Sequence, residues 1–328
     1  MKFQLLIPQH KETDAVIRPL LDSVAIQQNV PFDEIGTVIC NDGSDVFLSE
    51  ELLSSYPFRI EYHKEPHRGV SATRNACLDH ATADYVMFCD ADDMFCNACG
   101  LWLIVREMET GFDSLVSMFI EETRMPPAPD AEPVPIYVNH EMDSTFVHGK
   151  VHRRQYLLDN GIRWNDALTI HEDSYFNILC QNLSDNVKYC QTPFYLWKWR
   201  DDSVCRHDPK YILKTYRNML DSNDELVDEF LRRKKPDKAA FFTAFIIFDA
   251  YYNLNKPEWI DQENQEHRDS TQRRFAKYFA KHRAIWNSIS DQDKMAISNS
   301  VRGRTVSEGM MMESVTLGDW LRKMEGLI

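Results

Sequence analysis

Short apolar runs alternate with amphipathic segments over the first 90 residues. Four runs have the length and the β-branched or aromatic content of buried strands: 3–7 (FQLLI), 35–40 (IGTVIC), 58–62 (FRIEY) and 84–89 (DYVMFC). Between them, residues 13–28 and 70–82 carry apolar positions at helical spacing, and Pro8 is expected to stop the first strand. Strands that alternate with helices in this way predict an α/β fold, with a mostly parallel sheet flanked by helices.

The pattern changes twice further along the chain. Helices are expected at 101–110, 150–160 and 173–182, a strand at 114–120 and an extended segment at 187–199. Residues 121–145 contain five prolines and predict a long surface excursion, either an inert insertion or a flap that faces substrate. From about residue 208 the segments are long and amphipathic. We therefore expect two domains, an α/β catalytic domain at 1–205 and an all-helical domain at 206–328.

Acidic side chains follow two of the predicted strands where each strand ends. Asp42 comes after the second strand, and Asp90 and Asp92 come directly after the apolar run Val86–Cys89. Ligands of such sheets collect at the carboxyl ends of the strands. Two carboxylates are the right number to hold Mg²⁺ or Mn²⁺ together with the phosphates of a substrate. An idle acidic turn is the alternative, because a D-x-D pair alone is a weak signal.

Several motifs in order resemble the family 2 glycosyltransferases of GT-A fold. The resemblance covers roughly residues 1–205 and rests on LLIPQHKE (5–12), CNDGSD (40–45), RGVSATRNACLDHATADYVMFCDADD (68–93) and HEDSYF (171–176). It implies that Pro8 and its loop border the nucleotide and that Asp42 contacts the base. Gly69, Arg74 and Asn75 match the family's Gly…Ala-Arg-Asn segment, although Thr73 replaces the usual Ala.

The resemblance also implies roles for the acids. Asp90 is expected near the ribose and Asp92 on the metal, while in the pair Glu172-Asp173 the aspartate is the general base. His207 is a candidate third metal ligand, against the simpler interpretation of a surface histidine. Two other simple alternatives remain open. The acids of the pair can merely favour a helix N-terminus, and Arg74 can pair with nearby acids instead of neutralising phosphate.

The implied activity is metal-dependent, inverting transfer of a sugar from a UDP-hexose or UDP-HexNAc to an acceptor hydroxyl. Mn²⁺ or Mg²⁺ would stabilise the leaving diphosphate, and a carboxylate would take the proton of the acceptor. The acceptor could be a glycan, a lipid-linked sugar or another hydroxyl compound. Two alternatives use the same fold. A nucleotidyl- or phospho-transferring enzyme would release pyrophosphate, and a non-catalytic nucleotide- or carbohydrate-binding module would show no turnover.

Charge, apolar runs and cysteines narrow the choice of partner and compartment. Residues 1–205 carry 16 Lys and Arg against 32 Asp and Glu, whereas residues 206–328 carry 21 against 19. The acidic first part argues against a nucleic-acid partner, and the later helices are suited to dimerisation or to an anionic surface. The chain has no apolar run of about 18 residues that could span a membrane. Its eight cysteines include one C-x-x-C pair but not the second pair that a four-cysteine zinc site needs. We therefore expect a cytoplasmic protein, with peripheral membrane contact left open.

Overall fold

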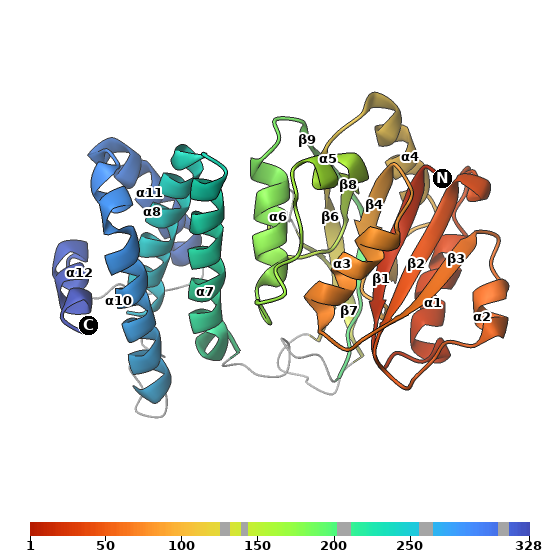
Figure 1. The fold of residues 1–328 in the computed structure, drawn as a ribbon, viewed down its shortest axis with the longest axis horizontal. Coiled ribbons are helices and arrows are strands. Elements are labelled where there is room, and N and C mark those ends of the chain that lie inside the picture. The colour runs from red at the N-terminus through yellow and green to blue at the C-terminus, as the bar shows by residue number, and fades with distance from the viewer. Residues whose placement is uncertain (125–131, 139–143, 202–210, 256–264, 308–314) are drawn as a thin grey trace. The chain divides into compact units, whose positions relative to one another are not determined.

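Strands between residues 3 and 197 form a mixed sheet (Figure 1). The computed structural model describes residues 1–124, 132–138, 144–201, 211–255, 265–307 and 315–328. The chain divides into two compact units, 1–203 and 204–328. The strands are β1 (Phe3–Gln9), β2 (Ile35–Asp42), β3 (Arg59–Glu65), β4 (Tyr85–Phe88), β5 (Met94–Phe95), β6 (Ser114–Thr123), β7 (Val134–Val138), β8 (Lys150–Arg153) and β9 (Val187–Trp197).

The strand order is β3-β2-β1-β4-β8-β6-β9-β5, with β7 paired to β6 outside this path. β1, β2, β3, β4, β6 and β9 run in one direction, and β5, β7 and β8 run in the other. The register pairs Gln9 with Asn41 and Leu6 with Phe88. As a result, the residues that follow β1, β2 and β4 emerge at the same edge of the sheet, as predicted for a mostly parallel arrangement.

Helices cover both faces of this sheet because successive strand residues point to opposite sides. The helical segments of the unit are α1 (Asp14–Ala25), the 3₁₀ turn η1 (Phe32–Glu34), α2 (Glu50–Ser54), α3 (Val70–His80), α4 (Gly100–Thr110), α5 (Arg154–Asp159) and α6 (Glu172–Asn182). Met87 of β4 belongs to the core that includes α1, α2 and α4. Its neighbour Phe88 contacts Trp164 and Phe176 on the other face, where α3 and α6 lie (Figure 1).

Three predicted elements differ from the structure. β1 continues through Pro8, because β4 has already ended opposite Leu6 and β1 keeps only β2 as its neighbour there. The predicted helix at 150–160 is instead strand β8 followed by α5, and β8 is held between β4 and β6. Part of the proline-rich stretch forms β7, which pairs only with β6 and so tolerates Pro135.

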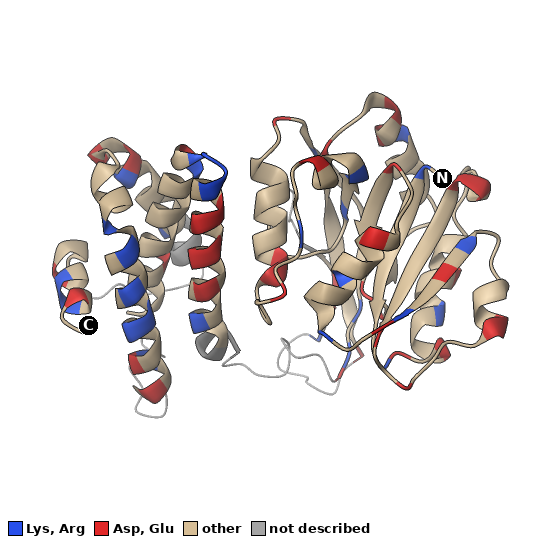
Figure 2. Cartoon of the chain, viewed as in Figure 1, with Lys and Arg blue, Asp and Glu red and all other residues tan. Residues whose placement is uncertain are grey.

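The second unit is helical, as its long amphipathic segments predict. Its helices are α7 (Tyr211–Arg232), α8 (Pro236–Asn253), α10 (Gln265–Ser288), α11 (Asp291–Ser307) and α12 (Leu317–Glu325). Acidic residues recur along α7 and basic residues along α10 (Figure 2), and Arg274 of α10 pairs with Asp221 and Asp224 of α7. No helix in the described part of the chain is long and apolar enough to cross a membrane.

Candidate functional site

A cavity of about 430 Å³ lies where β1, β2 and β4 end. It is lined by Pro8, Gln9, His10, Glu12, Asp42, His67, Gly69, Val70, Thr73, Arg74, Asp90, Ala91, Asp92 and Arg200. The structure therefore brings together all five predicted residues of the nucleotide end: Pro8, Asp42, Arg74, Asp90 and Asp92. Predicted residues from three strand ends and one helix share one cavity because the parallel register places those strand ends side by side.

Asp42 is the last residue of β2, and its buried carboxylate is held by main-chain donors. The amides of Arg68 and Gly69 donate to it at 2.8 and 3.0 Å, and Nδ1 of His67 lies 3.0 Å from Oδ2. Burial opposes its ionisation, but these donors, the Thr73 hydroxyl and the neighbouring His67 imidazole hold the pKa of Asp42 below its usual value. Asp42 is thus an oriented carboxylate at the cavity wall.

Arg74 is a buried guanidinium on α3 that joins two groups of acids. Nη2 donates to Asp90 at 2.8 Å and Nη1 donates to Glu172 at 3.0 Å, while the guanidinium lies over the Trp164 ring at 4.4 Å. Burial opposes its charge, but Asp90 and Glu172 outweigh that effect and raise the pKa of Arg74. Arg74 therefore does pair with nearby acids, one of the two alternatives that the sequence left open. This pairing connects the cavity wall to helix α6.

The acids after β4 have three different environments. Burial raises the pKa of Asp90, but Arg74 outweighs it and the net pKa is lowered. Burial and the charge of Asp90 raise the pKa of Asp92, which Arg200 contacts at 2.8 Å. Asp93 is fully buried, and burial raises its pKa well above the usual range.

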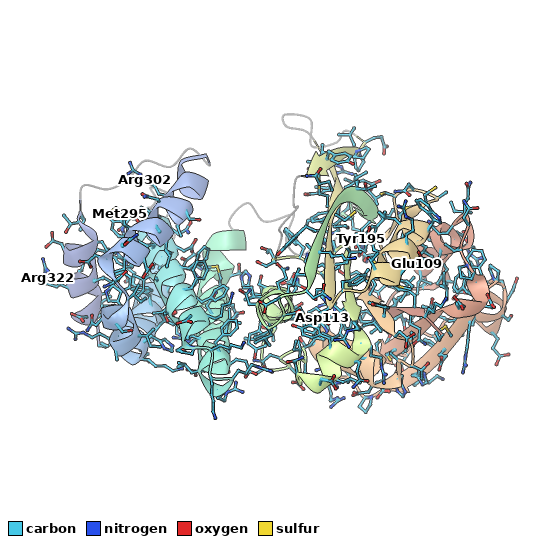
Figure 3. All side chains as sticks on the ribbon, turned by 90° about the horizontal axis from the view of Figure 1, so that it is seen from above. Glu109, Asp113, Tyr195, Met295, Arg302 and Arg322 are labelled. Carbon is cyan, nitrogen blue, oxygen red and sulfur yellow. The ribbon has the colours of Figure 1, made fainter. Side chains whose placement is uncertain are left out.

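Asp93 holds the end of β4 in place through hydrogen bonds to β9 and to the residues that follow it. It accepts the hydroxyl of Tyr195 at 2.5 Å and the amide of Lys198 at 3.0 Å. Tyr195 stands on β9 (Figure 3), and its oxygen also lies 3.3 Å from the amide of Asp90. The network ties β9 to the D-x-D segment and fixes the segment's path.

The predicted pair Glu172-Asp173 begins helix α6, after His171 in the left-handed conformation at φ 64°. Burial and the negative charge of Glu172 raise the pKa of Asp173 to about 7, against the opposing effects of Arg74 and Lys150. A carboxyl that ionises near neutrality can accept a proton from a hydroxyl group, which is the property required of a general base. Glu172 and Asp173 are not among the residues that line the cavity, but Glu172 is linked to it through Arg74, whose guanidinium also contacts Asp90.

The donor set after β4 fits a hard divalent cation. Asp90 and Asp92 offer carboxylate oxygens, the ligands that Mg²⁺ and Mn²⁺ prefer. The guanidinium of Arg200 contacts Asp92 at 2.8 Å and places a positive charge beside this carboxylate. His207, the candidate third ligand, lies outside the described residues.

Arg200 and His67 are two of the cavity residues that were not predicted as site residues from the sequence. Arg200 lies 108 positions from Asp92, and no local pattern links them. His67 could have been noticed because it precedes Gly69, whose positive φ of 90° allows the chain to turn into α3. Both residues reach the cavity through tertiary contacts.

Comparison with known proteins agrees with these features. The model of the family described as glycosyl transferase family 2 matches residues 5–131. The minor teichoic acid biosynthesis protein GgaB of Bacillus subtilis is 30% identical over 95 residues, which are 28% of this chain and 10% of GgaB. The succinoglycan biosynthesis protein ExoM of Rhizobium meliloti is 41% identical over 63 residues, 19% of each chain. These matches span less than a fifth of either relative.

A solved structure shares the fold over most of the chain. The crystal structure of residues 1–349 of S. aureus TarS superposes with a TM-score of 0.61 and 16% identity, covering 93% of this chain and 92% of that one. The expected GT-A fold with its helical C-terminal region is thereby confirmed. Residues 5–131 are therefore similar to the family 2 glycosyltransferases, and the fold of the chain is that of TarS.

Proposed function

We propose that the chain is a metal-dependent, inverting glycosyltransferase that moves a sugar from a nucleoside diphosphate to an acceptor hydroxyl. The observation that carries this proposal is the bridge formed by Arg74. Its guanidinium contacts Asp90, which lines the cavity, and Glu172, the neighbour of Asp173, and these two contacts support a joint role for the two pairs of acids. Asp42, which lines the same cavity, is suited to accept an N–H group of a nucleobase.

The donor is proposed to be a UDP-hexose or UDP-HexNAc. TarS, which shares the fold at 15–16% identity, has been crystallised in complex with UDP and with UDP-GlcNAc. The names of GgaB and ExoM refer to teichoic acid and succinoglycan biosynthesis. These names support a growing glycan as the acceptor.

Asp173 is proposed to take the proton of the acceptor hydroxyl. The acceptor oxygen forms a bond to the anomeric carbon, the bond from that carbon to the diphosphate oxygen breaks, and UDP leaves. A single displacement of this kind inverts the anomeric configuration. A divalent ion at Asp90 and Asp92 would act as a Lewis acid toward the leaving diphosphate. Above pH 7 the Asp173 carboxylate is largely ionised and ready to accept the proton.

The test uses hydrolysis of the donor, in which water replaces the acceptor. Wild-type chain with Mn²⁺ and UDP-GlcNAc, or a UDP-hexose, should release UDP. Asp173→Asn should lower the rate at least about 100-fold with UDP affinity unchanged. Asp166→Asn, at an exposed position of the same unit, is the matched control and should behave as wild type. Release of pyrophosphate, or wild-type turnover by Asp173→Asn, would contradict the proposal.

A further inference from the structure

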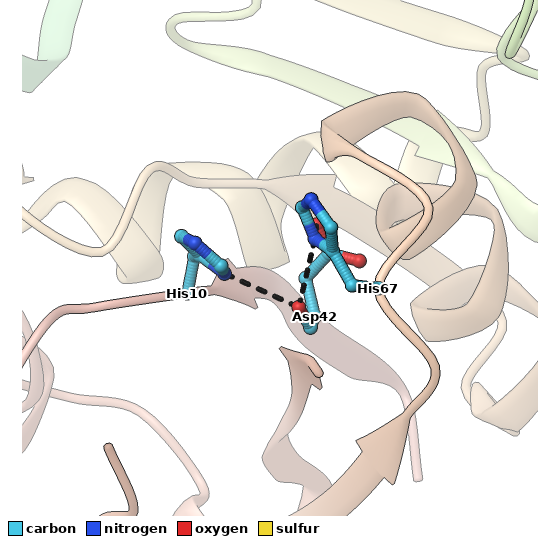
Figure 4. Close-up of side chains that lie close together, drawn as sticks. All are labelled: His10, Asp42 and His67. Atoms are coloured by element: carbon cyan, nitrogen blue, oxygen red, sulfur yellow. Dashed lines mark hydrogen bonds and ion pairs between the residues drawn. The ribbon is translucent and has the colours of Figure 1, made fainter. Parts of the chain in front are cut away.

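Two histidines and one aspartate converge at one end of the cavity. His10 follows β1, Asp42 ends β2, and His67 precedes α3. Figure 4 shows both imidazoles directed at Asp42. Nδ1 of His10 lies 3.2 Å from the main-chain oxygen of Asp42, and Nδ1 of His67 lies 3.1 Å from the same oxygen. Hydrogen bonding to a carbonyl explains each contact singly, but it does not require two imidazoles to meet at one residue.

One pair of candidate ligand atoms is already spaced as in a zinc coordination shell, and the third lies near it. Tetrahedral Zn²⁺ with bonds of about 2.0–2.1 Å places its ligand atoms roughly 3.4 Å apart. Nδ1 of His67 is 3.0 Å from Oδ2 of Asp42. One ligand atom from each of His10, Asp42 and His67 lies within 4.8 Å of the others. Ordinary side-chain rotation would therefore bring all three to bonding distance of one ion.

The chemistry of the set also distinguishes it from the D-x-D acids. Imidazole nitrogens suit Zn²⁺ and its neighbours in the transition series, whereas Mg²⁺ and Mn²⁺ prefer the all-oxygen set at Asp90 and Asp92. Asp42 is held in its ionised form by main-chain donors, and Glu12 adds a second carboxylate to the cavity wall. The ring of His67 is 64% exposed, so it has room to reorient toward an ion.

We propose that His10, Asp42 and His67 form a Zn²⁺ site at the nucleotide end of the cavity. The three residues supply two imidazole nitrogens and one carboxylate oxygen, and water completes the tetrahedron. Bound Zn²⁺ would occupy Asp42, the group proposed to recognise the nucleobase. The ion is therefore a competitor of the donor, in contrast to the divalent ion at Asp92. The inference goes beyond the proposed function, because Zn²⁺ binding does not depend on any sugar transfer.

The experiment titrates Zn²⁺ into chelator-stripped full-length chain and measures the dissociation constant by calorimetry. Wild type should give a saturable isotherm for one Zn²⁺ ion. His10→Gln and His67→Gln should each raise the Zn²⁺ dissociation constant at least about tenfold. The matched control is His80→Gln. His80 stacks on His63 and belongs to a different candidate cluster with Cys40 and Glu65, so its loss should leave the titration unchanged.

The absorption spectrum of bound Co²⁺ gives a second test, because it reports the type of ligand atom directly. Co²⁺ at this site should show visible bands of a tetrahedral nitrogen and oxygen set, without the near-ultraviolet band of a cobalt–thiolate bond. A thiolate band, loss of binding only in His80→Gln, unchanged titrations of both His→Gln variants, or no saturable Zn²⁺ binding would each overturn the proposal.

Zn²⁺ should also weaken binding of UDP with Mg²⁺. If wild type bound no UDP at all, the proposed transferase would fail while the Zn²⁺ titration would still decide the metal site.

Discussion

At Asp173, opposing effects set the protonation of a single carboxyl group. Burial and the charge of Glu172 disfavour the carboxylate, while Arg74 and Lys150 favour it, and the pKa is raised to about 7. In the folded protein the group therefore keeps its proton over a pH range in which an unfolded aspartate has lost it. The raised pKa that suits Asp173 to act as a general base also means that its ionised form lowers the free energy of unfolding.

Asp173→Asn is expected to stabilise the fold at alkaline pH. Between about pH 4 and 7 the unfolded wild-type chain releases this proton and the folded chain keeps it, so wild-type stability falls across that window. The variant lacks this loss. Its free energy of unfolding should exceed that of wild type by on the order of 1–3 kcal/mol at pH 8 and by much less at pH 4.5. Chemical denaturation at both pH values measures the difference, and an equal difference at both would contradict the raised pKa.

Single residues were predictable from the sequence where a short motif carries them. Asp42, Asp90 and Asp92 follow strands, so the strand pattern alone places them at one sheet edge. Arg200 was not predictable, because its pairing with Asp92 depends on how β9 crosses the sheet. The pKa of Asp173 was equally inaccessible, since it depends on burial and on charges from α3 and β8.

At the scale of elements, the turn after β2 determines the shape of the nucleotide end. Gly43 adopts φ +65°, and a Cβ there would lie 2.3 Å from the amide nitrogen of His67. No residue with a side chain fits without moving the segment that supplies the Asp42 donors Arg68 and Gly69. A glycine at this turn is therefore required by both its dihedral angle and its close approach.

Gly43→Ala should disturb the site as well as the fold. Gly111→Ala is its matched control, because Gly111 has φ +70° but a Cβ at that position would meet no atom within 4 Å. Both variants incur about 1–2 kcal/mol for the left-handed backbone, and only Gly43→Ala adds a clash. Thermal unfolding should show the larger loss for Gly43→Ala, and UDP affinity should fall only in that variant. Equal unfolding temperatures and equal affinities would show that the turn does not position His67.

Elements were predictable where the apolar period was unambiguous. Strands β1 to β4, helices α1 and α3, and the helical character of the chain after residue 208 follow from spacing alone, whereas α2 and η1 were not predicted. β8 was mistaken for part of a helix, because four residues are too few to show a period and the strand is stabilised by its neighbours β4 and β6. β7 was hidden by prolines that only an edge position tolerates.

At the scale of the whole molecule, the two units have separate sources of stability. The helical unit contains a charge network between α7 and α10, in which Asp224 contacts Arg274, Lys281 and His282 at 2.6–2.7 Å. Burial opposes ionisation of Asp224, but these partners hold its pKa well below the usual value. The stability that this carboxylate contributes is present above its unfolded pKa and is lost as the pH falls through its folded pKa.

Asp224→Asn should therefore destabilise the helical unit and leave the nucleotide site intact. Removing the charge leaves Arg274, Lys281 and the buried His282 short of a partner. We expect a loss of roughly 1–3 kcal/mol at pH 7, discounted for the partly exposed lysine, and a smaller loss at pH 2. Urea denaturation measures the loss, and calorimetry should give an unchanged UDP affinity. A tenfold weaker affinity would contradict the assignment of binding to residues within 1–203.

The measurement that tests the central claim most directly is calorimetry of UDP binding with Mn²⁺ and with excess chelator. Wild type is predicted to bind UDP in the presence of Mn²⁺, and at least about tenfold more weakly when the metal is removed. Asp92→Asn should show the weak affinity under both conditions, while Asp166→Asn should match wild type. Equal UDP affinity of wild type and Asp92→Asn with Mn²⁺, or no UDP binding by wild type, would contradict a metal-dependent nucleotide site at the carboxyl ends of these strands.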